Sequence, residues 1–498
     1  MSTAAIISDT AVEDYAEEFA KFASRLSIGK IPAEAVTAAK VNLFDTAACA
    51  TAGISAAGVK DLAGLVIDWG GKSEALIWCT NARVPAHHAA WVNGMMAHAR
   101  DYDDTHDEAV LHAGVSVIPA AIAAAELNAA ATGADLLVGI VAGLELICRL
   151  GVATTIGIIE SGFIYTSLLG HFAATAAASR VMGFNTEQTV NALGIAYSQA
   201  AGTHQVTRDA ALTKRIQPGF AAKTALISVA MTRAGIRGAR NTFEGIDGLF
   251  RTYLRGRYNP AALRDGLGQR FEFLNLSYKP YPCCRFDHTA IDAALQIRRQ
   301  LNGDISGIKR ISARVNRQAY EAVCTPVGIR KSPETIVQAQ FSIPYTVACA
   351  LAKGGVGLAD FTDTALRDPA VRVLAAKVDA RPDQTIERDW SRNVSPTHLA
   401  IETDGGGTFE ARVDYPRGHR QAPMSKEDFD RKMTGCLEMS GMPWPGNTID
   451  RLHTAIDGVE FAPHGALVIE PLLHRLILIY KPPPIRSPPS GRGSSTWQ

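Results

Sequence analysis

The sequence lacks an excess of charge of either sign. Its 50 Lys and Arg residues stand against 49 Asp and Glu residues, which leaves a formal net charge of only +1. A chain so balanced has no overall electrostatic attraction to nucleic acid or to an anionic membrane surface. We therefore expect neither nucleic acid nor membrane as a partner, although a local basic pocket for an anionic ligand stays open.

Cysteine pairing is lacking as well. The 8 cysteines are scattered along the chain, no two form a C-x-x-C pair, and none has the Cys/His spacing of a zinc site. The first residues contain no basic stretch ahead of an apolar core, so we expect no signal peptide. These features favour a reducing compartment and predict a cytoplasmic location.

Long uninterrupted hydrophobic runs are also few. The apolar stretches near 115–150 and 165–200 are rich in Ala and Gly, and they are interrupted by charged residues such as Glu126, Glu145 and Arg180. This pattern indicates buried helices of a large core rather than membrane spans. With 498 residues, the chain is too long for one hydrophobic core, so two domains are expected and three remain open.

The first half of the chain has helical periodicity. From Val12 to about Gly268, apolar residues recur at spacings of three and four, and candidate helix caps such as Thr132 and Asn185 precede several of these segments. After about Phe271 the pattern changes to strand-like alternation with intervening helices, including a hairpin around the glycines 405–407. The prediction is mainly α: an all-helical domain (1–271 and 416–460), a smaller α+β domain (272–415) and an extension (461–498) with a disordered Pro/Ser-rich tail.

Polar residues crowd the segment from Asp101 to His112, which lies between two apolar helical stretches. Three interpretations stay open for it: a solvated acidic loop, the mouth of a pocket, or a metal site. Catalytic groups concentrate on loops that rigid elements hold in place. A metal site would lack any specific ligand motif, so we predict no metal and no cofactor.

Two basic segments could complete a site for an anion. Lys214 and Arg215 precede a Pro-Gly break that we expect to start a new helix, whose free N–H groups favour carboxylates. The run from Lys279 to His288 lies at the predicted domain junction and includes Arg285. Domain junctions are favoured ligand sites. A nucleophilic role for Cys283 or Cys284 is open but disfavoured, because small buried cysteines usually serve packing.

Together these segments resemble the MmgE/PrpD family. The residues that carry the resemblance are Asp101-Tyr-Asp-Asp-Thr105 with His112, Lys214-Arg-Ile-Gln-Pro-Gly219, Lys279-Pro-Tyr-Pro-Cys-Cys284 with His288, Pro333-Glu-Thr to Tyr345, and Pro416-Arg-Gly to Lys432. The resemblance covers most of residues 10–455 in the right order. It implies a large helical domain, an α+β lid domain, a homodimer, an active site between the domains and no iron–sulfur cluster.

The resemblance also implies site residues. Asp101, Thr105, His112, Lys214 and Lys279 match the family's active-site positions. We expect His112, Lys214, Lys279 and Asp101 to be catalytic. Either lysine could act as a base if burial lowers its pKa, and Asp101 could orient His112. The predicted substrate-binding residues are Thr105, Arg285, Arg215 and His288.

The sequence departs from the family pattern at several places. Ala113-Gly114-Val115 follows His112 where the dehydratases have Pro-Ser-Asp, Ile164 stands where many members have histidine, and Cys284 and Gly328 replace a histidine and a tyrosine of the decarboxylase. We therefore expect an enzyme that moves a proton next to a carboxylate of a small di- or tricarboxylate. Epimerisation of an iminodisuccinate-like substrate is preferred over dehydration of a 2-methylcitrate-like hydroxyacid, and decarboxylation of cis-aconitate ranks below both. The non-enzyme alternative is a helical binding protein that has lost its chemistry.

Overall fold

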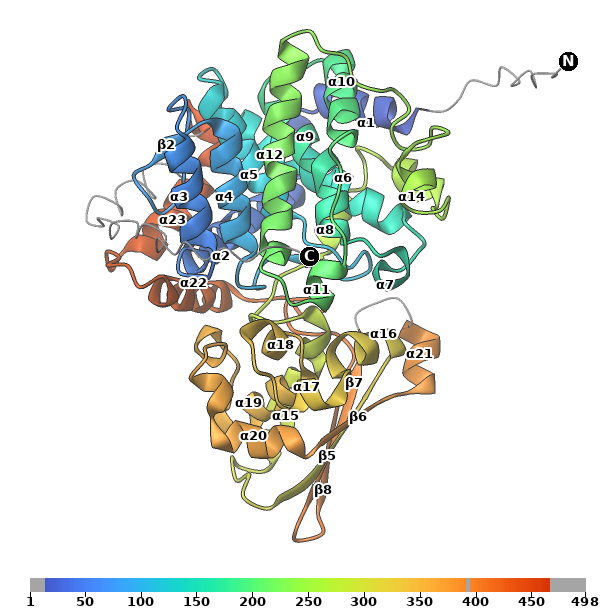
Figure 1. Ribbon diagram of the computed structural model, residues 1–498, viewed down its shortest axis with the longest axis vertical. Coiled ribbons are helices and arrows are strands. Elements are labelled where there is room, and N and C mark those ends of the chain that lie inside the picture. The colour runs from blue at the N-terminus through green and yellow to red at the C-terminus, as the bar shows by residue number, and fades with distance from the viewer. Residues whose placement is uncertain (1–13, 391–394, 466–498) are drawn as a thin grey trace, which may run out of the picture.

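A computed structural model describes residues 14–390 and 395–465. It has a large helical part and a smaller part with a sheet, which lie one above the other in Figure 1. Two separate hydrophobic clusters match this division: one is built mostly from residues before 277 and after 432, the other from residues 281–413. The mainly α fold with a small α+β part is thus confirmed. Most of the predicted extension, residues 466–498 with the tail, lies outside the described residues.

The large domain is built from helices that pack closely around α6 and α9. Its helices are α1 (Tyr15–Arg25), α2 (Ala33–Gly53), α3 (Val59–Trp69), α4 (Ala86–His98), α5 (Gly114–Leu127), α6 (Gly133–Ala153), α7 (Ile158–Ser161), α8 (Tyr165–Leu168), α9 (Gly170–Val181), α10 (Thr186–Tyr197), α11 (Gln205–Arg208), α12 (Thr213–Arg233), α13 (Leu249–Thr252), α14 (Pro260–Arg264), α22 (Lys426–Ser440) and α23 (Thr448–Asp457). It is mainly rather than entirely helical, because the strands β1 (Ala75–Leu76) and β2 (Arg83–Val84) pair within it.

Helix α12 corrects one prediction. It begins at Thr213 and runs through Pro218, so the Pro-Gly pair does not start a new helix. The reason is tertiary packing against α4. A Cβ on Gly219 would lie 2.3 Å from the carbonyl oxygen of Trp91, and one on Gly94 would lie 2.8 Å from the Cα of Gly219. Two glycines thus let the helices approach closely, and this packing outweighs the helix-breaking tendency of proline.

Helix α6 is the one described helix that is long and apolar enough to cross a membrane. It has 21 residues, its most apolar window has a mean hydropathy of 2.1, and 94% of that window is buried inside the protein. A Thr132–Asp135 capping box fixes its start, as Asn185 with Gln188 fixes the start of α10. Helix α6 packs as the core helix that its interrupted apolar pattern predicts.

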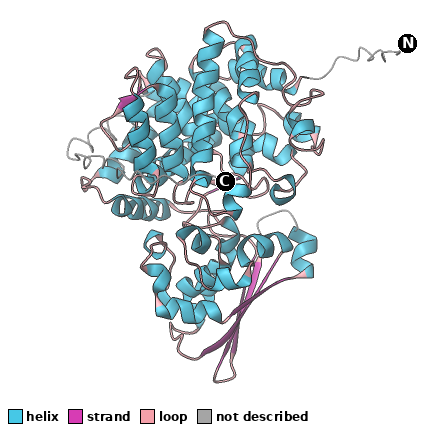
Figure 2. Ribbon diagram, viewed as in Figure 1, coloured by secondary structure: helices cyan, strands magenta, loops and turns pink. Residues whose placement is uncertain are grey.

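The small domain contains a four-stranded sheet among its described residues. The strand order is β6 (Val378–Pro382), β5 (Ile308–Val315), β7 (Thr397–Thr403), β8 (Thr408–Val413), with only β5 and β6 parallel. The predicted hairpin is β7–β8, and β6 was not foreseen. Helices cover one face of the sheet, as Figure 2 shows. The helices of this domain are α15 (His288–Gln300), α16 (Arg317–Ala319), α17 (Val327–Lys331), α18 (Ile336–Gln340), α19 (Ile343–Lys353), α20 (Pro369–Ala376) and α21 (Gln384–Trp390).

The junction between the domains depends on a break that the sequence pattern did not indicate. Residues 332–352 do not form one helix; α18 ends at Gln340, and Ser342 caps α19 by accepting a hydrogen bond from the Tyr345 N–H at 3.1 Å. Gln340, placed at this break, donates to the backbone oxygens of Arg100 (2.8 Å) and Pro282 (3.1 Å). The break therefore ties the small domain to the loop after α4.

A buried histidine in α9 gives the fold a specific pH dependence. Burial lowers the pKa of His171 to about 4, and its Nδ1 lies 2.7 Å from the Ser167 carbonyl oxygen. Above pH ~6.5, the pKa of histidine in the unfolded chain, His171 is neutral in both states and its low folded-state pKa does not change the free energy of unfolding. As the pH falls toward 4 the unfolded chain binds a proton that the folded chain refuses, so stability drops by up to about 3 kcal/mol.

The variant His171→Asn keeps a donor for the Ser167 oxygen but cannot titrate. We expect its urea midpoint to fall less than that of the wild type between pH 7 and pH 4. Equal losses in the two proteins would contradict the assignment.

Candidate active site

The segment between α4 and α5 is buried, although it is rich in charge. Asp101, Asp103, Asp104, Thr105 and His106 each expose 4% of their surface or less. The interpretation as a solvated acidic loop is therefore wrong. Buried carboxylates require compensating partners.

A short strand pair attaches this segment to the predicted junction. Strand β3 (Thr105–His106) pairs antiparallel with β4 (Leu276–Ser277), with Thr105 opposite Ser277. Asp104 then accepts from the backbone N–H groups of Ala113 (2.9 Å) and Gly114 (3.0 Å), which begin α5. Burial raises the pKa of Asp104 to about 6. These local bonds hold the backbone at Thr105–His106 and the side chain of Asp104 in place.

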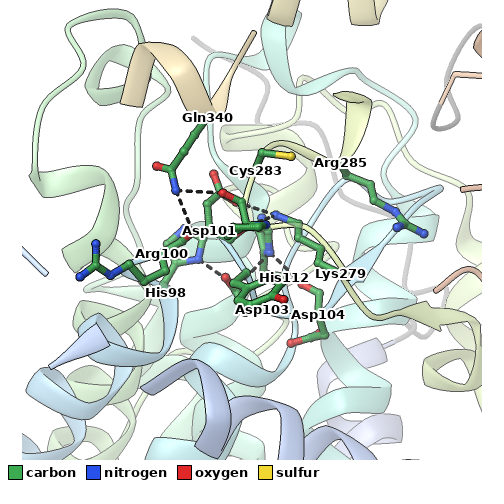
Figure 3. A network of polar contacts seen from close by, with 12 residues as sticks. His98, Arg100, Asp101, Asp103, Asp104, His112, Lys279, Cys283, Arg285 and Gln340 are labelled. Carbon is green, nitrogen blue, oxygen red and sulfur yellow. Dashed lines mark hydrogen bonds and ion pairs between the residues drawn. The ribbon is translucent and has the colours of Figure 1, made fainter. Parts of the chain in front are cut away.

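Asp101 joins the two lysines that the sequence singled out. Its Oδ2 accepts from Lys214 Nζ at 3.0 Å, and its Oδ1 from Lys279 Nζ at 2.6 Å. Lys279 also donates to the backbone oxygen of Asp101 at 3.0 Å. The cluster of Asp101, Lys279 and His112 is visible in Figure 3. One negative charge thus holds two positive ones, and a net positive charge remains for an anionic ligand.

The electrostatics of this trio restrict which group can be a base. Burial opposes the charged form of Asp101, but Lys214 and Lys279 hold its pKa well below the usual range. Burial likewise opposes the charge on Lys279, yet Asp101 raises the pKa of that ammonium group. Lys279 therefore stays protonated near neutral pH, and its contribution is electrostatic rather than that of a base.

His112 contacts a different carboxylate from the one predicted. Its Nδ1 lies 2.9 Å from Oδ2 of Asp103 and 2.8 Å from the backbone oxygen of Asp104. The orienting partner is thus Asp103, and Asp101 is occupied by the lysines. His98, at the end of α4, places its Nδ1 2.9 Å from the same Asp103 oxygen. Burial lowers the pKa of His98 to about 4, so this ring is neutral at pH 7.

These groups open into a cavity of about 550 Å³ between the domains. The large domain contributes His98, Asp101, Thr105, His112 and Lys214 to its wall. The small domain contributes Glu321, Arg330 and Phe341, and the ring of Phe341 lies 5.2 Å from Lys214 Nζ. A volume of this size suits a small organic anion.

Three residues predicted to bind substrate have other partners. Arg285 lines the cavity, but its Nε and Nη2 bind the two oxygens of Asp107 at 3.0 and 3.2 Å, and its Nη1 donates to Arg417. Arg215 and His288 are buried and do not line this cavity; Arg215 lies 3.5 Å from the Ala57 oxygen, and His288 lies beside Arg285.

Neither adjacent cysteine has the properties of a nucleophile. Cys284 lines the cavity, but burial raises its pKa to about 12, and Cys283 is fully buried with its pKa raised further. The thiol form is unreactive toward carbon centres.

Several residues of the cavity were not predicted from the sequence. His204 directly precedes α11, Arg208 ends α11, and Arg330 lies in α17. No sequence motif indicates these three residues. Burial lowers the pKa of His204 to about 4. Arg330 donates from Nε to the Thr325 oxygen at 2.8 Å, so backbone oxygens fix its guanidinium.

His98, Asp103 and His112 also have the residue types of a metal site. Their ligand atoms lie within 4.8 Å of one another. A divalent ion would need one free lone pair from each residue. Here both Nδ1 atoms meet the same carboxylate oxygen at hydrogen-bond distance, which is the arrangement of an orienting carboxylate.

Comparison with known proteins identifies the family. Residues 17–261 match the MmgE/PrpD N-terminal domain, and residues 281–443 match the MmgE/PrpD C-terminal domain. The chain belongs to the MmgE/PrpD family. This confirms the resemblance drawn from the motifs, and the chain is therefore an enzyme rather than a scaffold without chemistry.

Several curated proteins are similar to this chain over half of their length or more. A cis-aconitate decarboxylase-like protein of Aspergillus oryzae is 26% identical, with 89% of this chain and 95% of the relative covered. Human cis-aconitate decarboxylase is 28% identical over 70% of this chain and 72% of its own. The 2-methylcitrate dehydratase of Cupriavidus necator is 24% identical over 50% of this chain and 52% of the dehydratase.

Proposed function

We propose that this enzyme is a cofactor-independent lyase that acts on a small tricarboxylate of the citrate or aconitate type. The observation that carries the proposal is the pairing of Lys214 and Lys279 on Asp101, beside His112, in the interdomain cavity. The decarboxylases and dehydratases among its relatives are lyases by name, and they favour this class over the epimerisation preferred from the sequence.

The geometry supports chemistry at a carbon next to a carboxylate. Removing or adding a proton there creates an enolate-like charge, which fixed ammonium groups stabilise. Lys279 and Lys214 supply that charge. We assign the general acid/base role to His112, because Lys279 stays protonated and both carboxylate oxygens of Asp101 accept hydrogen bonds from lysines. In an elimination, the C–H electron pair forms the new double bond, and the leaving group departs with its bonding pair.

The homodimer and the cytoplasmic location stay predictions. An exposed aromatic group on α3 and α12 is the surface that we expect a second copy to cover. Trp69 is 53% exposed and Phe220 38%, with Trp91 between them at ring distances of 6.2 and 5.1 Å. Light scattering would test the homodimer prediction, since a dimer would show twice the mass of one chain.

Incubation in D2O with citrate, 2-methylcitrate, cis-aconitate and iminodisuccinate tests the proposed reaction class. We expect one tricarboxylate to gain or lose enoate absorbance, or to release CO2, with deuterium at the reacting carbon. Deuterium entering recovered iminodisuccinate with inversion, and without an enoate, would instead establish the epimerase. A double variant, Lys214→Met with Lys279→Met, is the control, and unchanged turnover in it would place the chemistry elsewhere.

A further inference from the structure

The shared carboxylate of Asp103 determines which nitrogen of each histidine carries a proton. Burial opposes its charge, but His112 and His98 hold its pKa well below the usual range, so it stays an acceptor. Each Nδ1 at 2.9 Å must therefore donate. For His112 the backbone oxygen of Asp104, 2.8 Å away, requires the same tautomer independently.

A neutral imidazole with its proton on Nδ1 has a free lone pair on Nε2. Asp103 is completely buried and does not line the cavity, whereas both rings do. The ring centroids of His98 and His112 lie 4.8 Å apart. No bond within the described residues reaches Nε2 of either ring. The edge that carries Nε2 is thus the edge left to face the cavity.

We propose that His98 is a second substrate-contacting imidazole, and that its Nε2 accepts a hydrogen bond from a hydroxyl group of the substrate. Asp103 is the positioning residue that aligns His98 with His112. Asp101, Asp103, Lys214 and His112 are the charged or titratable groups around His98. Burial keeps the His98 ring neutral, so its Nε2 is an uncharged acceptor at the wall of the cavity. The inference rests on the proposed polycarboxylate substrate and narrows it to a hydroxyacid.

Two small ligands allow the contribution of the hydroxyl contact to binding to be measured separately. Citrate and tricarballylate differ only by the hydroxyl group, and calorimetry measures the Kd of each compound. We expect the wild type to bind citrate about 10-fold more tightly than tricarballylate. His98→Asn keeps a donor for Asp103 but ends short of Nε2, so the ratio should fall to about 1, with Kd for tricarballylate almost unchanged. His98→Gln places an amide oxygen near the Nε2 position and should restore part of the ratio.

The positioning role of Asp103 has a matched control. Asp103→Asn should weaken citrate selectivity, because the amide no longer fixes both rings. Glu145→Gln also removes a buried carboxylate. Glu145 accepts from Arg149 at 2.5 Å and does not line the cavity, so this variant should keep the ratio of the tricarballylate Kd to the citrate Kd. Retention of the full ratio in His98→Asn would overturn the proposal and leave this ring a structural role only.

A second measurement separates this proposal from the proposed function. Diethyl pyrocarbonate acylates unprotonated imidazole nitrogens, and mass spectrometry maps the modified residues. Because the pKa of His98 is about 4, we expect it to react at pH 5, where an ordinary imidazole is mostly protonated. If His98 reacts but neither citrate nor tricarballylate binds, the proposed substrate class is wrong, while the accessibility of His98 Nε2 is supported. If His98 is inert at every pH, the proposal fails whatever the substrate is.

Discussion

Lys214→Met is expected to lower kcat/KM by about 1000-fold, the loss typical for one preorganised charge at a developing oxyanion. Its Nζ is held by Asp101 at 3.0 Å, and the side chain is 12% exposed where it meets the cavity. A neutral side chain leaves Asp101 with Lys279 alone, which removes the net positive charge that an enolate requires. Steady-state kinetics on whichever tricarboxylate turns over in the D2O panel measures the effect.

The same helix offers a control for this prediction. Lys223 in α12 lies over the Trp91 ring at 4.2 Å and does not line the cavity. Lys223→Met should therefore keep kcat/KM within about 3-fold, since it removes one partly exposed cation–π contact. A Lys214→Met enzyme that is folded by circular dichroism and retains nearly full kcat/KM would show that this lysine takes no part in the reaction.

Lys432→Met is expected to destabilise the protein by about 3–5 kcal/mol, because it leaves a buried carboxylate without its counter-charge. Lys432 Nζ donates to Asp45 Oδ1 and to the Tyr102 backbone oxygen, both at 2.6 Å, and lies 4.2 Å from the Tyr102 ring centroid. This contact joins the returning helix α22 to α2 and to the active-site loop. The urea midpoint of the large domain should fall, and activity should be lost at lower denaturant concentration.

Two further variants show whether the buried charge is the cause. Lys426→Met in the same helix removes an exposed pair with Asp430, and should change stability by less than about 0.5 kcal/mol. Adding Asp45→Asn to Lys432→Met removes the unpaired charge and should recover much of the loss. If Lys426→Met and Lys432→Met are equally stable, the interior ion pair does not hold α22 in place.

Local signals account for much of the fold. Side chains at a helix start, such as Thr132 and Asn185, accept hydrogen bonds from the first turn, so their pattern located α6 and α10. The β7–β8 hairpin follows from alternation on both sides of a glycine turn. Pro218 shows the limit of such signals, because contacts with α4 keep α12 continuous.

The sequence by itself determined the family and the two kinds of domain, because motifs and periodicity are properties of neighbouring residues. That Asp101, His112, Lys214 and Lys279 share one site was implied by the family resemblance. Only the tertiary structure decided which partner each of these groups contacts. Asp101 meets its lysines 113 and 178 positions away, and the histidines share Asp103 rather than Asp101. Protonation and orientation depend on burial and on such distant partners, which chain order does not encode.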